Sequence, residues 1–445
     1  MTPHPRPSIR RAWPLVALLP ALSGAWAQPT QVVRPPQSQA WIDISTYSGM
    51  GLPPGMAMPG MAGGGAPDAG AAGGGVGSLL GGLMAGGRGG AAPANRFGNT
   101  QAMAVGRWMD VTLYTRANPN LSEAQQNVPP GLLSPALKLQ APREAPRRPA
   151  PEPGDERTVE PEYERPKGKL HLYWGCGAEV RAGQPRTLDF ATATPQELGQ
   201  FFQARSATQR GTHSTPGRPV WPSRDDTRMI PDQASLVGEH GFSGQGVPDG
   251  FRFQITAAQD LMPPIALRQQ PAGGAVNLEW QNLPTARGYF LAAMGSRGGD
   301  EMVLWTSSEL PDSGFGLIDY QTNGAVDRWL REKVLLPAGS TRCSVPSGVF
   351  ADRQGAMLRM VAYGNELNVA HPPRPTDPRV AWEPVWAAKV RVKSVAMAML
   401  GDDSGGAMAG RGDSAPAAAE KSPAAEAKDA VKETVKDALR GLFKR

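Results

Sequence analysis

The chain has 445 residues, among them 54 glycines and 45 prolines, and a formal net charge of +6. A chain of this length allows two or three domains, but the glycine and proline content indicates that long stretches lie outside any folded core. Three arginines lie in the first 11 residues, which we expect to be removed, and the remaining 43 basic residues nearly balance 40 acidic ones. This balance argues against nucleic acid as a partner.

Residues 1–27 have the features of a secretory signal peptide. An apolar run at 12–22 follows the three arginines, and Ala25-Trp-Ala27 supplies the small residues that a signal peptidase accepts, so cleavage is expected after Ala27. The run is short and interrupted by two prolines, and no other stretch reaches the roughly 18 apolar residues of a membrane span. We therefore expect a periplasmic or secreted protein without a membrane span after cleavage.

Cys176 and Cys343 are the two cysteines of the chain. In an oxidising compartment such a pair suggests a disulfide, and closing so long a loop would contribute on the order of 4–5 kcal/mol if the bond is unstrained. The alternative is two buried thiols in separate domains. The sequence leaves both open, because it does not show whether the two Cα atoms lie within ~7 Å.

The first predicted module, 28–140, contains strand-like runs of alternating apolar and polar residues. These runs lie at 41–46, 107–115 and 136–139. Residues 51–93 are almost wholly Gly, Ala, Met and Pro, and we expect them to form a disordered insertion, because they cannot bury enough apolar surface to offset their backbone entropy. A linker rich in Pro and charged residues follows at 141–166.

The second predicted module, 167–268, begins with a strand at 169–174 and contains a second alternating strand at 251–256. Thr194-Pro-Gln-Glu197 has the form of a capping box with Pro at the first helical position, which predicts a short helix to about Phe202. Residues 206–250 have no clear pattern. A long loop in a compact domain is functional or mobile, so this segment is the favoured place for a surface site.

The third predicted module, 272–398, has the clearest strand pattern, with turn residues between its runs. The runs lie at 276–280, 288–294, 302–306, 357–363 and 388–395. Between them Val326, Trp329, Leu330 and Val334 fall on one helical face, with Asn323 as the expected N-cap. In the last run three cations share one strand face, which solvent exposure and protection of a sheet edge explain equally well. These cations are Lys389, Arg391 and Lys393.

Part of this module resembles fibronectin type III domains. Leu278-Glu-Trp280 followed by Gly288-Tyr289 is similar to the second and third strands of that family, and the 359–365 stretch is similar to the penultimate strand. The module is longer than the family norm, and Ala356 and Met357 stand where the family usually has a Tyr. The resemblance implies a β-sandwich that serves as an interaction or spacer module.

Residues 399–422 are again rich in Gly, Ala, Asp and Ser and are expected to form a disordered linker. Ser422-Pro423 then opens a predicted helix at 423–445, with an apolar stripe and oppositely charged residues three apart. Such a helix is marginal alone in water, so we expect it to dock on another surface, to self-associate or to lie on a membrane. The predicted fold class is mainly β: antiparallel β-sandwich modules with short helices and disordered segments.

No catalytic or metal-binding constellation is recognisable in the sequence. The nearest approach to a serine elbow, at 241–245, ends in Gln instead of Gly, and the five histidines are scattered. We therefore predict a binding or scaffolding protein of the cell envelope, not an enzyme, with a protein or glycan partner and without a cofactor or metal. The alternative is an extracytoplasmic hydrolase whose residues converge from distant positions; the candidates are His171, Asp189, Asp225 and His240.

Three tryptophans are candidates for stacking on a sugar ring: Trp305, Trp382 and Trp386. The competing interpretation, which aromatic residues generally favour, is packing in the core or between modules.

Overall fold

The computed structural model describes residues 31–49, 95–133, 135–142, 168–203, 205–207, 211–298, 300–350 and 356–400. The expected signal peptide, the 51–93 insertion, the 423–445 helix and nearly all of the two predicted linkers lie outside these residues.

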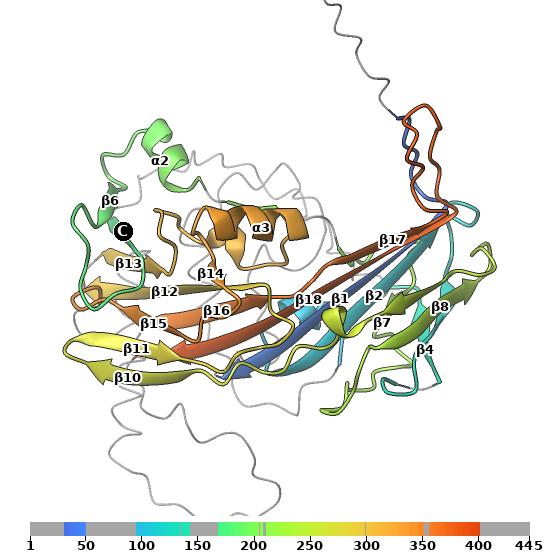
Figure 1. The fold of residues 1–445 in the computed structure, drawn as a ribbon, viewed down its shortest axis with the longest axis horizontal. Coiled ribbons are helices and arrows are strands. Elements are labelled where there is room, and N and C mark those ends of the chain that lie inside the picture. The colour runs from blue at the N-terminus through green and yellow to red at the C-terminus, as the bar shows by residue number, and fades with distance from the viewer. Residues whose placement is uncertain are drawn as a thin grey trace, which may run out of the picture.

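Strands dominate the described residues (Figure 1). In chain order they are β1 (Ser38–Gly49), β2 (Gly106–Thr115), β3 (Glu123–Asn127), β4 (Ala136–Gln140), β5 (Lys169–Trp174), β6 (Arg186–Asp189), β7 (Val220–Trp221), β8 (Gly238–Gly244), β9 (Arg252–Ile255), β10 (Arg268–Ala272), β11 (Ala275–Glu279), β12 (Gly288–Gly298), β13 (Glu301–Thr306), β14 (Leu336–Pro337), β15 (Arg342–Val345), β16 (Met357–Tyr363), β17 (Leu367–His371) and β18 (Trp386–Met399). The helices are α2 (Pro195–Phe201) and α3 (Asn323–Arg331), with 3-10 turns η1 (Asn99–Gln101), η2 (Ala257–Gln259) and η3 (Phe315–Leu317).

In the described part of the chain, 15 strands form one large sheet. Its order is β6-β5-β13-β12-β16-β18-β1-β2-β7-β4-β3-β8-β9, with β14 beside β12 and β17 beside β18. Strand β1 runs parallel to β18, and β13 runs parallel to β5, whereas the neighbouring pairs elsewhere in this sheet are antiparallel. The mainly β fold is thus confirmed. The expectation of purely antiparallel sheets is wrong, because this sheet is mixed.

Strands from all three predicted modules are neighbours in the large sheet. Strand β1, from the first module, lies between β2 and β18, and its register with β18 runs without a break from Ser38↔Trp386 to Gly49↔Met397. Strand β5, from the second module, pairs with β13 of the third. An alternating pattern decides which side chains share a face, but it does not decide which strand lies alongside. Separate sandwiches joined by linkers therefore do not describe this sheet.

A second, three-stranded sheet packs against one face of the large sheet (Figure 1). Its order is β10-β11-β15, and Val276, Leu278 and Val345 belong to the same buried cluster as Leu291 of β12 and Met360 of β16. Leu278 of the fibronectin-like pattern lies on β11 of the small sheet, whereas Gly288 and Tyr289 begin β12 of the large sheet, and the resemblance itself stays a prediction. The ring of the buried Trp280 packs edge-on against that of Tyr289, with 5.6 Å between the two ring centroids.

The opposite face of the large sheet is covered by α3, whose buried residues are Ala325, Val326 and Trp329. The N-cap is Thr322, whose side chain accepts a hydrogen bond from the Ala325 N–H, so the predicted cap Asn323 is wrong by one residue. The helix ends before Val334 because Lys333 adopts a positive φ of 59°, and Val334 N–H then bonds back to the Trp329 carbonyl.

Helix α2 begins with the capping box that the sequence predicts. The Thr194 side chain accepts a bond from the Glu197 N–H, and the Glu197 carboxylate accepts one from the Thr194 N–H, with Pro195 in the first turn. Local rules therefore identify this helix start correctly, because every partner lies within three residues.

Candidate functional site

The predicted basic face of β18 lies inside the molecule. Strand β18 is central in the sheet, and Lys393 and Arg391 are 0% and 5% exposed. Neither solvent exposure nor protection of a sheet edge explains these cations, so both interpretations of the basic face that the sequence suggested are wrong. Three segments cover this face: the turn at 98–101, the loop at 211–213 and the stretch at 319–321 that follows η3.

Arg391 forms a bidentate ion pair with Asp43. The two residues are direct register partners on β18 and β1, and Nε and Nη2 of Arg391 each lie 2.6 Å from a different carboxylate oxygen. The loop above completes the shell of the carboxylate, because Thr212 donates its N–H at 2.9 Å and its hydroxyl at 2.7 Å to Oδ2. A buried carboxylate needs such donors, since water no longer solvates it.

Lys393 occupies the next position on the same face. Its Nζ lies 3.1 Å from Oδ1 of Asp319 and 4.2 Å from the centre of the Tyr320 ring, and the Arg391 guanidinium lies 4.4 Å from that ring. Burial raises the pKa of Asp319, but the charges of Lys393 and Arg391 outweigh this effect and lower the pKa to about 2. The ring of Tyr320 thus lies over two cations, in the geometry of cation–π contacts.

Asp110 is a further buried carboxyl group on this face. It is the register partner of Asp43 across β1 and β2, and its hydrogen-bond donors are neutral groups: the N–H of Gly98 at 2.9 Å, and the N–H and hydroxyl of Thr100. Burial dominates and raises its pKa to about 7, although these donors partly oppose the rise and Asp43 adds to it. The group is therefore balanced between its two protonation states near neutral pH.

The buried charge network, which we define as Asp43, Asp110, Asp319, Arg391 and Lys393, pairs its members with one another or with neutral donors, and Asp319 lies at its rim with 34% of its side chain exposed. Asp43 and Asp319 face cations, whereas Asp110 has neutral hydrogen-bond donors and a pKa that burial raises to about 7. A third β18 cation, Lys389, faces Glu366 at 3.8 Å. The network links β1 and β18, the first and last strands of the described chain, and this role is structural.

Two of the three candidate tryptophans are buried. Trp305 is 0% exposed, and its indole N–H donates to the Gly175 carbonyl at 3.0 Å; Trp386 is 6% exposed and stacks on Phe251 at 4.8 Å. These two present no free ring face at the surface, so core packing is their role. Trp382 is partly exposed, and the Arg374 guanidinium lies 5.7 Å from its ring.

The four hydrolase candidates do not converge. His171 on β5 and Asp189 on β6 belong to one end of the strand order, whereas His240 is on β8, near the other end, and Asp225 follows β7. Neighbours in the sheet can share a site, but these two groups are separated by most of its strands.

Each candidate histidine has its own partners. His171 lies 2.9 Å from the hydroxyl of Thr187 and 3.1 Å from a carboxylate oxygen of Glu301. His240 is fully buried between the Gln126 amide at 3.1 Å and a backbone carbonyl at 2.7 Å, and burial lowers its pKa. These contacts are those of histidines that are held in place by the fold.

Cys176 and Cys343 form a disulfide with a Cα–Cα distance of 5.2 Å. Cys343 lies on β15 of the small sheet and Cys176 follows β5 of the large one, so the bond joins the two sheets. The backbone is paired beside it, with Gly177 N–H donating to the Ser344 carbonyl at 3.0 Å. Of the two alternatives that the sequence leaves open, the structure has the bonded one.

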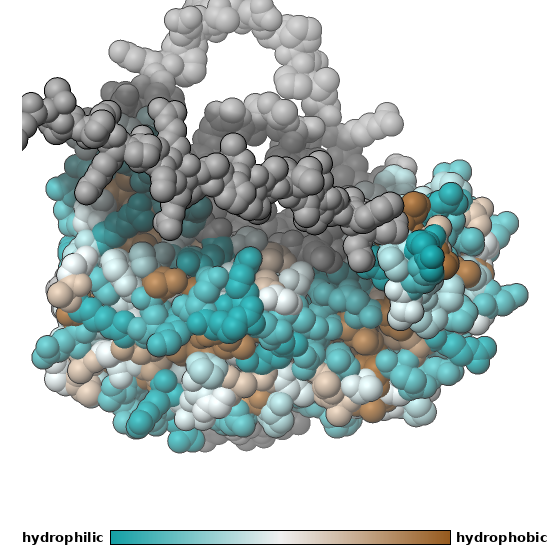
Figure 2. All heavy atoms as spheres, turned by 45° about the horizontal axis from the view of Figure 1, so that its top comes forward, coloured by the Kyte–Doolittle hydropathy of each residue, from teal (hydrophilic) through white to brown (hydrophobic). Residues whose placement is uncertain are grey.

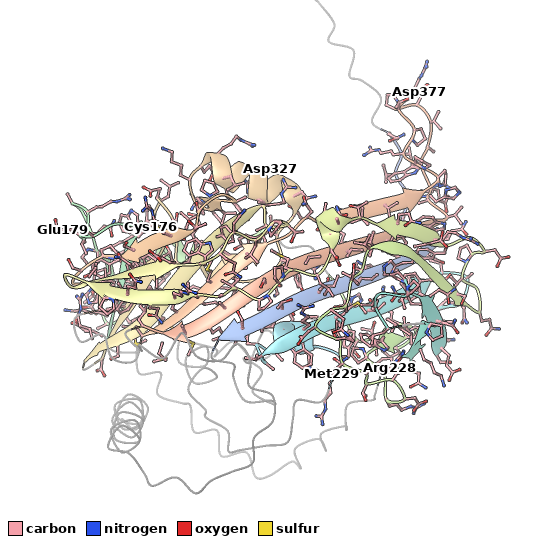
Figure 3. The ribbon with its side chains drawn as sticks, turned by 60° about the horizontal axis from the view of Figure 1, so that its bottom comes forward. Cys176, Glu179, Arg228, Met229, Asp327 and Asp377 are labelled. Carbon is pink, nitrogen blue, oxygen red and sulfur yellow. A yellow bond between two sulfur atoms is a disulfide. The ribbon has the colours of Figure 1, made fainter. Side chains whose placement is uncertain are left out.

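An arm projects from the end of the molecule opposite the disulfide. We define it as residues 31–37 and 372–385; it rises beyond β17 at the upper right of Figure 1, and Figure 3 places Asp377 on it and Cys176 at the other end. Its two halves are joined by backbone hydrogen bonds from Trp382 to Val32 at 2.8 Å and from Arg34 to Trp382 at 2.9 Å. Seven prolines further restrict its backbone.

The arm exposes apolar side chains. Val32, Val33 and Val380 are 58%, 50% and 48% exposed, the three highest values among the large apolar residues of the described chain. Ion pairs hold its polar groups, with Glu383 between Arg34 at 3.1 Å and Arg116 at 2.9 Å. Hydrophobic residues lie at the surface of this end of the molecule, on the right in Figure 2.

A pocket of about 390 Å³ lies at the base of the arm, on the β8–β9 hairpin. We call it the foot pocket; its walls include Phe242, Val247 and Phe251, with the charged Glu239, Asp249 and Arg252 around them. Phe251 connects it to the arm, because the Trp386 ring that stacks on Phe251 also stacks on His371 at 5.6 Å, and the arm starts after His371. Arm and pocket therefore lie at one end of the protein.

Sequence comparisons add no family. No protein-family model matches the chain, and none of the curated proteins matches its sequence. Within the described residues, no helix is long and apolar enough to cross a membrane, and no group of three or more His, Cys, Asp or Glu is placed to hold a metal ion. The fold defines a mainly β protein with a large mixed sheet, a second sheet that a disulfide joins to it, and a projecting arm.

Proposed function

We propose that the chain is an exported binding or scaffolding protein of the cell envelope, which contacts its partners through the arm and the foot pocket. The observation that carries the proposal is the arm, where three valines are exposed on a proline-rich extension whose two halves are joined by backbone hydrogen bonds. Exposed apolar groups that are prevented from collapsing onto the body are typical of interaction surfaces. In this role the chain binds an envelope protein or a glycan and does not catalyse a reaction.

Two further features support export. The N-terminal 27 residues have the pattern of a secretory signal peptide, and the Cys176–Cys343 bond belongs to an oxidising compartment such as the periplasm or the extracellular space. Cell fractionation combined with intact-mass analysis tests this part. The expected product starts at Gln28 and occurs outside the cytoplasm, whereas an uncleaved chain in the cytoplasm would contradict export.

The binding surface is tested with two matched triple variants of the mature chain. The arm variant carries Val32→Ser, Val33→Ser and Val380→Ser, and the control variant carries Val105→Ser, Met229→Ser and Leu310→Ser at exposed apolar positions outside the arm. Binding of each to envelope protein and glycan fractions is then compared with that of the unaltered chain. Loss of binding in the arm variant alone supports the proposal, and equal binding of all three forms refutes the arm as the contact surface.

A further inference from the structure

We propose that the foot pocket binds a short zwitterionic peptide of dipeptide length, with the carboxylate of the peptide over Gly241 and its ammonium group at Glu239. The inference rests on the proposed function, since that function makes this end of the molecule the binding surface. It adds a ligand class and the residues that recognise each end of the ligand.

A glycine in the interior of a strand leaves a hollow in the pocket. Gly241 of β8 is the register partner of Asn127 on β3 and of Arg252 on β9, so it lies between two polar residues in one row across three strands. Its φ is not in the left-handed region, and an added Cβ would lie 3.5 Å from the nearest atom, which is ordinary contact. Neither the backbone nor crowding therefore requires glycine here. A glycine inside a strand often marks a place where a ligand approaches the backbone closely.

The accessible lining of the hollow is polar. Phe242 and Phe251 are only 5% and 2% exposed, because they point to the core face of the sheet. The alternation of β8 places Glu239, Gly241 and Ser243 on the opposite face, toward solvent. An apolar ligand, or a sugar ring that stacks on an aromatic side chain, therefore finds no matching surface in this pocket.

Hydrogen-bond donors lie on both sides of Gly241. The Nδ2 of Asn127 lies 3.9 Å from the position of a Cβ at Gly241, and Gln125 donates to the Oδ1 of the same amide at 2.8 Å, which orients it. On the other side the Cβ of Arg252 is also 3.9 Å away, and within the described residues its guanidinium has no hydrogen-bond or ion-pair partner. An amide N–H and a guanidinium on either side of a hollow are suited to binding a carboxylate.

Two carboxylates lie farther from the glycine. Glu239 is two residues from Gly241 on β8, and Asp249 is in the turn between β8 and β9. Among the residues that the structure describes, neither side chain has a hydrogen-bond or ion-pair partner. The pocket thus presents an unpaired base and unpaired acids at separate places, which matches a ligand that carries both charges.

The spacing of these charges determines the length of the ligand. Two residues along a strand cover about 7 Å, which is the separation of Gly241 and Glu239 along β8. An extended chain covers up to about 3.6 Å per residue, so the two ends of a dipeptide are also about 7 Å apart. The pocket volume of about 390 Å³ is in the range of small-ligand sites, roughly 300–1,000 Å³. A dipeptide can therefore reach both charge sites at once.

Saturation-transfer NMR of the mature chain with dialanine, near neutral pH and at low ionic strength, tests the site. Binding is expected with a dissociation constant of about 1 mM, a weak affinity because each exposed charge contributes little. Dialanine that is N-acetylated, or amidated at its carboxyl end, lacks one charge and should bind about threefold or more weakly. A neutral disaccharide should give no signal, and a disaccharide that binds where dialanine does not would overturn the peptide in favour of a glycan.

Two variants locate the bound peptide. Gly241→Val fills the hollow and should abolish the signal while the melting temperature is retained, because valine suits a strand. Arg252→Gln should weaken the binding of dialanine by about threefold or more but leave that of amidated dialanine unchanged, since only the former has a carboxylate. The control is Arg268→Gln on β10, an exposed arginine outside the pocket, which should bind both peptides like the unaltered chain.

The outcomes separate this inference from the proposed function. A chain that binds no dialanine up to the solubility limit, or a folded Gly241→Val variant that still binds it, overturns the peptide site. If Gly241→Val does not fold, Arg252→Gln decides, and equal losses for dialanine and its amide would overturn the role of the carboxylate. If dialanine does not bind but the arm variant loses binding to envelope fractions, the proposed function stands without this ligand. A chain that binds dialanine but retains no envelope protein or glycan has the peptide site and refutes the envelope partner.

Discussion

The ion pair between Arg391 and Asp43 offers the sharpest test of the buried charge network. Replacement of Arg391 by Met keeps most of the side-chain volume but removes both guanidinium contacts at 2.6 Å. Asp43, whose side chain is 3% exposed, then keeps the two Thr212 donors and has lost its bidentate cation. Removal of one partner of a buried pair typically costs about 3–5 kcal/mol.

Urea unfolding followed by tryptophan fluorescence measures this loss. With an m-value of about 3 kcal/mol/M, a loss of about 4 kcal/mol lowers the unfolding midpoint by more than about 1 M. The control is Arg379→Met on the arm, where the pair with Asp377 is at the surface and the arginine side chain is 78% exposed, so no clear shift is expected. If Arg391→Met shifts the midpoint no more than Arg379→Met does, the pair is not buried as described.

A double-mutant cycle isolates the interaction itself. Asp43→Ala with Arg391→Met removes both charges, so neither member of this pair is left buried without the other, and the double variant is expected to be more stable than the sum of the two single losses predicts. Additive losses would mean that the two side chains do not interact in the folded protein.

Three more predictions follow from individual residues. The pKa of Asp110 is raised to about 7 from an ordinary value near 3.8, so between these pH values the folded state holds a proton that the unfolded state has lost. Relative to Asp110→Asn, the free energy of unfolding of the wild-type protein should therefore fall by about 1.4 kcal/mol per pH unit from about pH 4 to about pH 7 and stay level above. A difference between the two proteins that does not change with pH would contradict the burial of Asp110. Gly211→Ala should disrupt the network and lower the melting temperature, because the new Cβ would lie 1.6 Å from Nη2 of Arg391. Gly199→Ala, on an exposed face of α2 with open space around it, should leave the melting temperature unchanged, and equal melting temperatures of the two variants would refute the close approach of the 211–213 loop. Replacement of both Cys176 and Cys343 by Ala should cost up to about 5 kcal/mol in urea unfolding, because the bond closes a loop across a sequence separation of 167, and an unchanged midpoint would show that it does not constrain the unfolded chain.

The sequence predicts strands well where the alternation is regular and poorly where the strands are short or polar. The runs at 169–174 and 357–363 coincide with β5 and β16. The missed strands include β3, whose sequence Glu-Ala-Gln-Gln-Asn carries one apolar side chain, and β7, which has two residues. Such strands form because their neighbours supply the hydrogen-bonding partners, and this information is not local.

The basic face of β18 shows a second limit. Alternation correctly separates Val390 and Val392 from the three cations, but the period alone does not say which face is covered. The acid that makes burial possible, Asp43, lies 348 positions earlier in the chain and has no local pattern of its own. A signal was present, since a lone Asp inside the β-rich run Trp41-Ile-Asp-Ile44 is unusual for a strand and points to a specific partner.

The sequence does not predict the arm, because its prolines interrupt the strand pattern on both of its halves. Prolines at 35, 36, 372, 373 and 375 break every strand pattern, and the two halves pair only because β1 and β18 start side by side at Ser38 and Trp386. The position of the arm is therefore a consequence of the parallel pairing at the centre of the sheet, the same pairing that places Asp43 beside Arg391.

Hydrogen exchange measured by mass spectrometry tests this central pairing most directly. If β1 and β18 are neighbours in the middle of one sheet, peptides that cover 38–49 and 386–399 should be among the slowest to exchange, and Arg391→Met should accelerate both to a similar extent. Fast exchange of the 38–49 peptide beside a protected 386–399 peptide, or acceleration of the latter alone in the variant, would contradict the account.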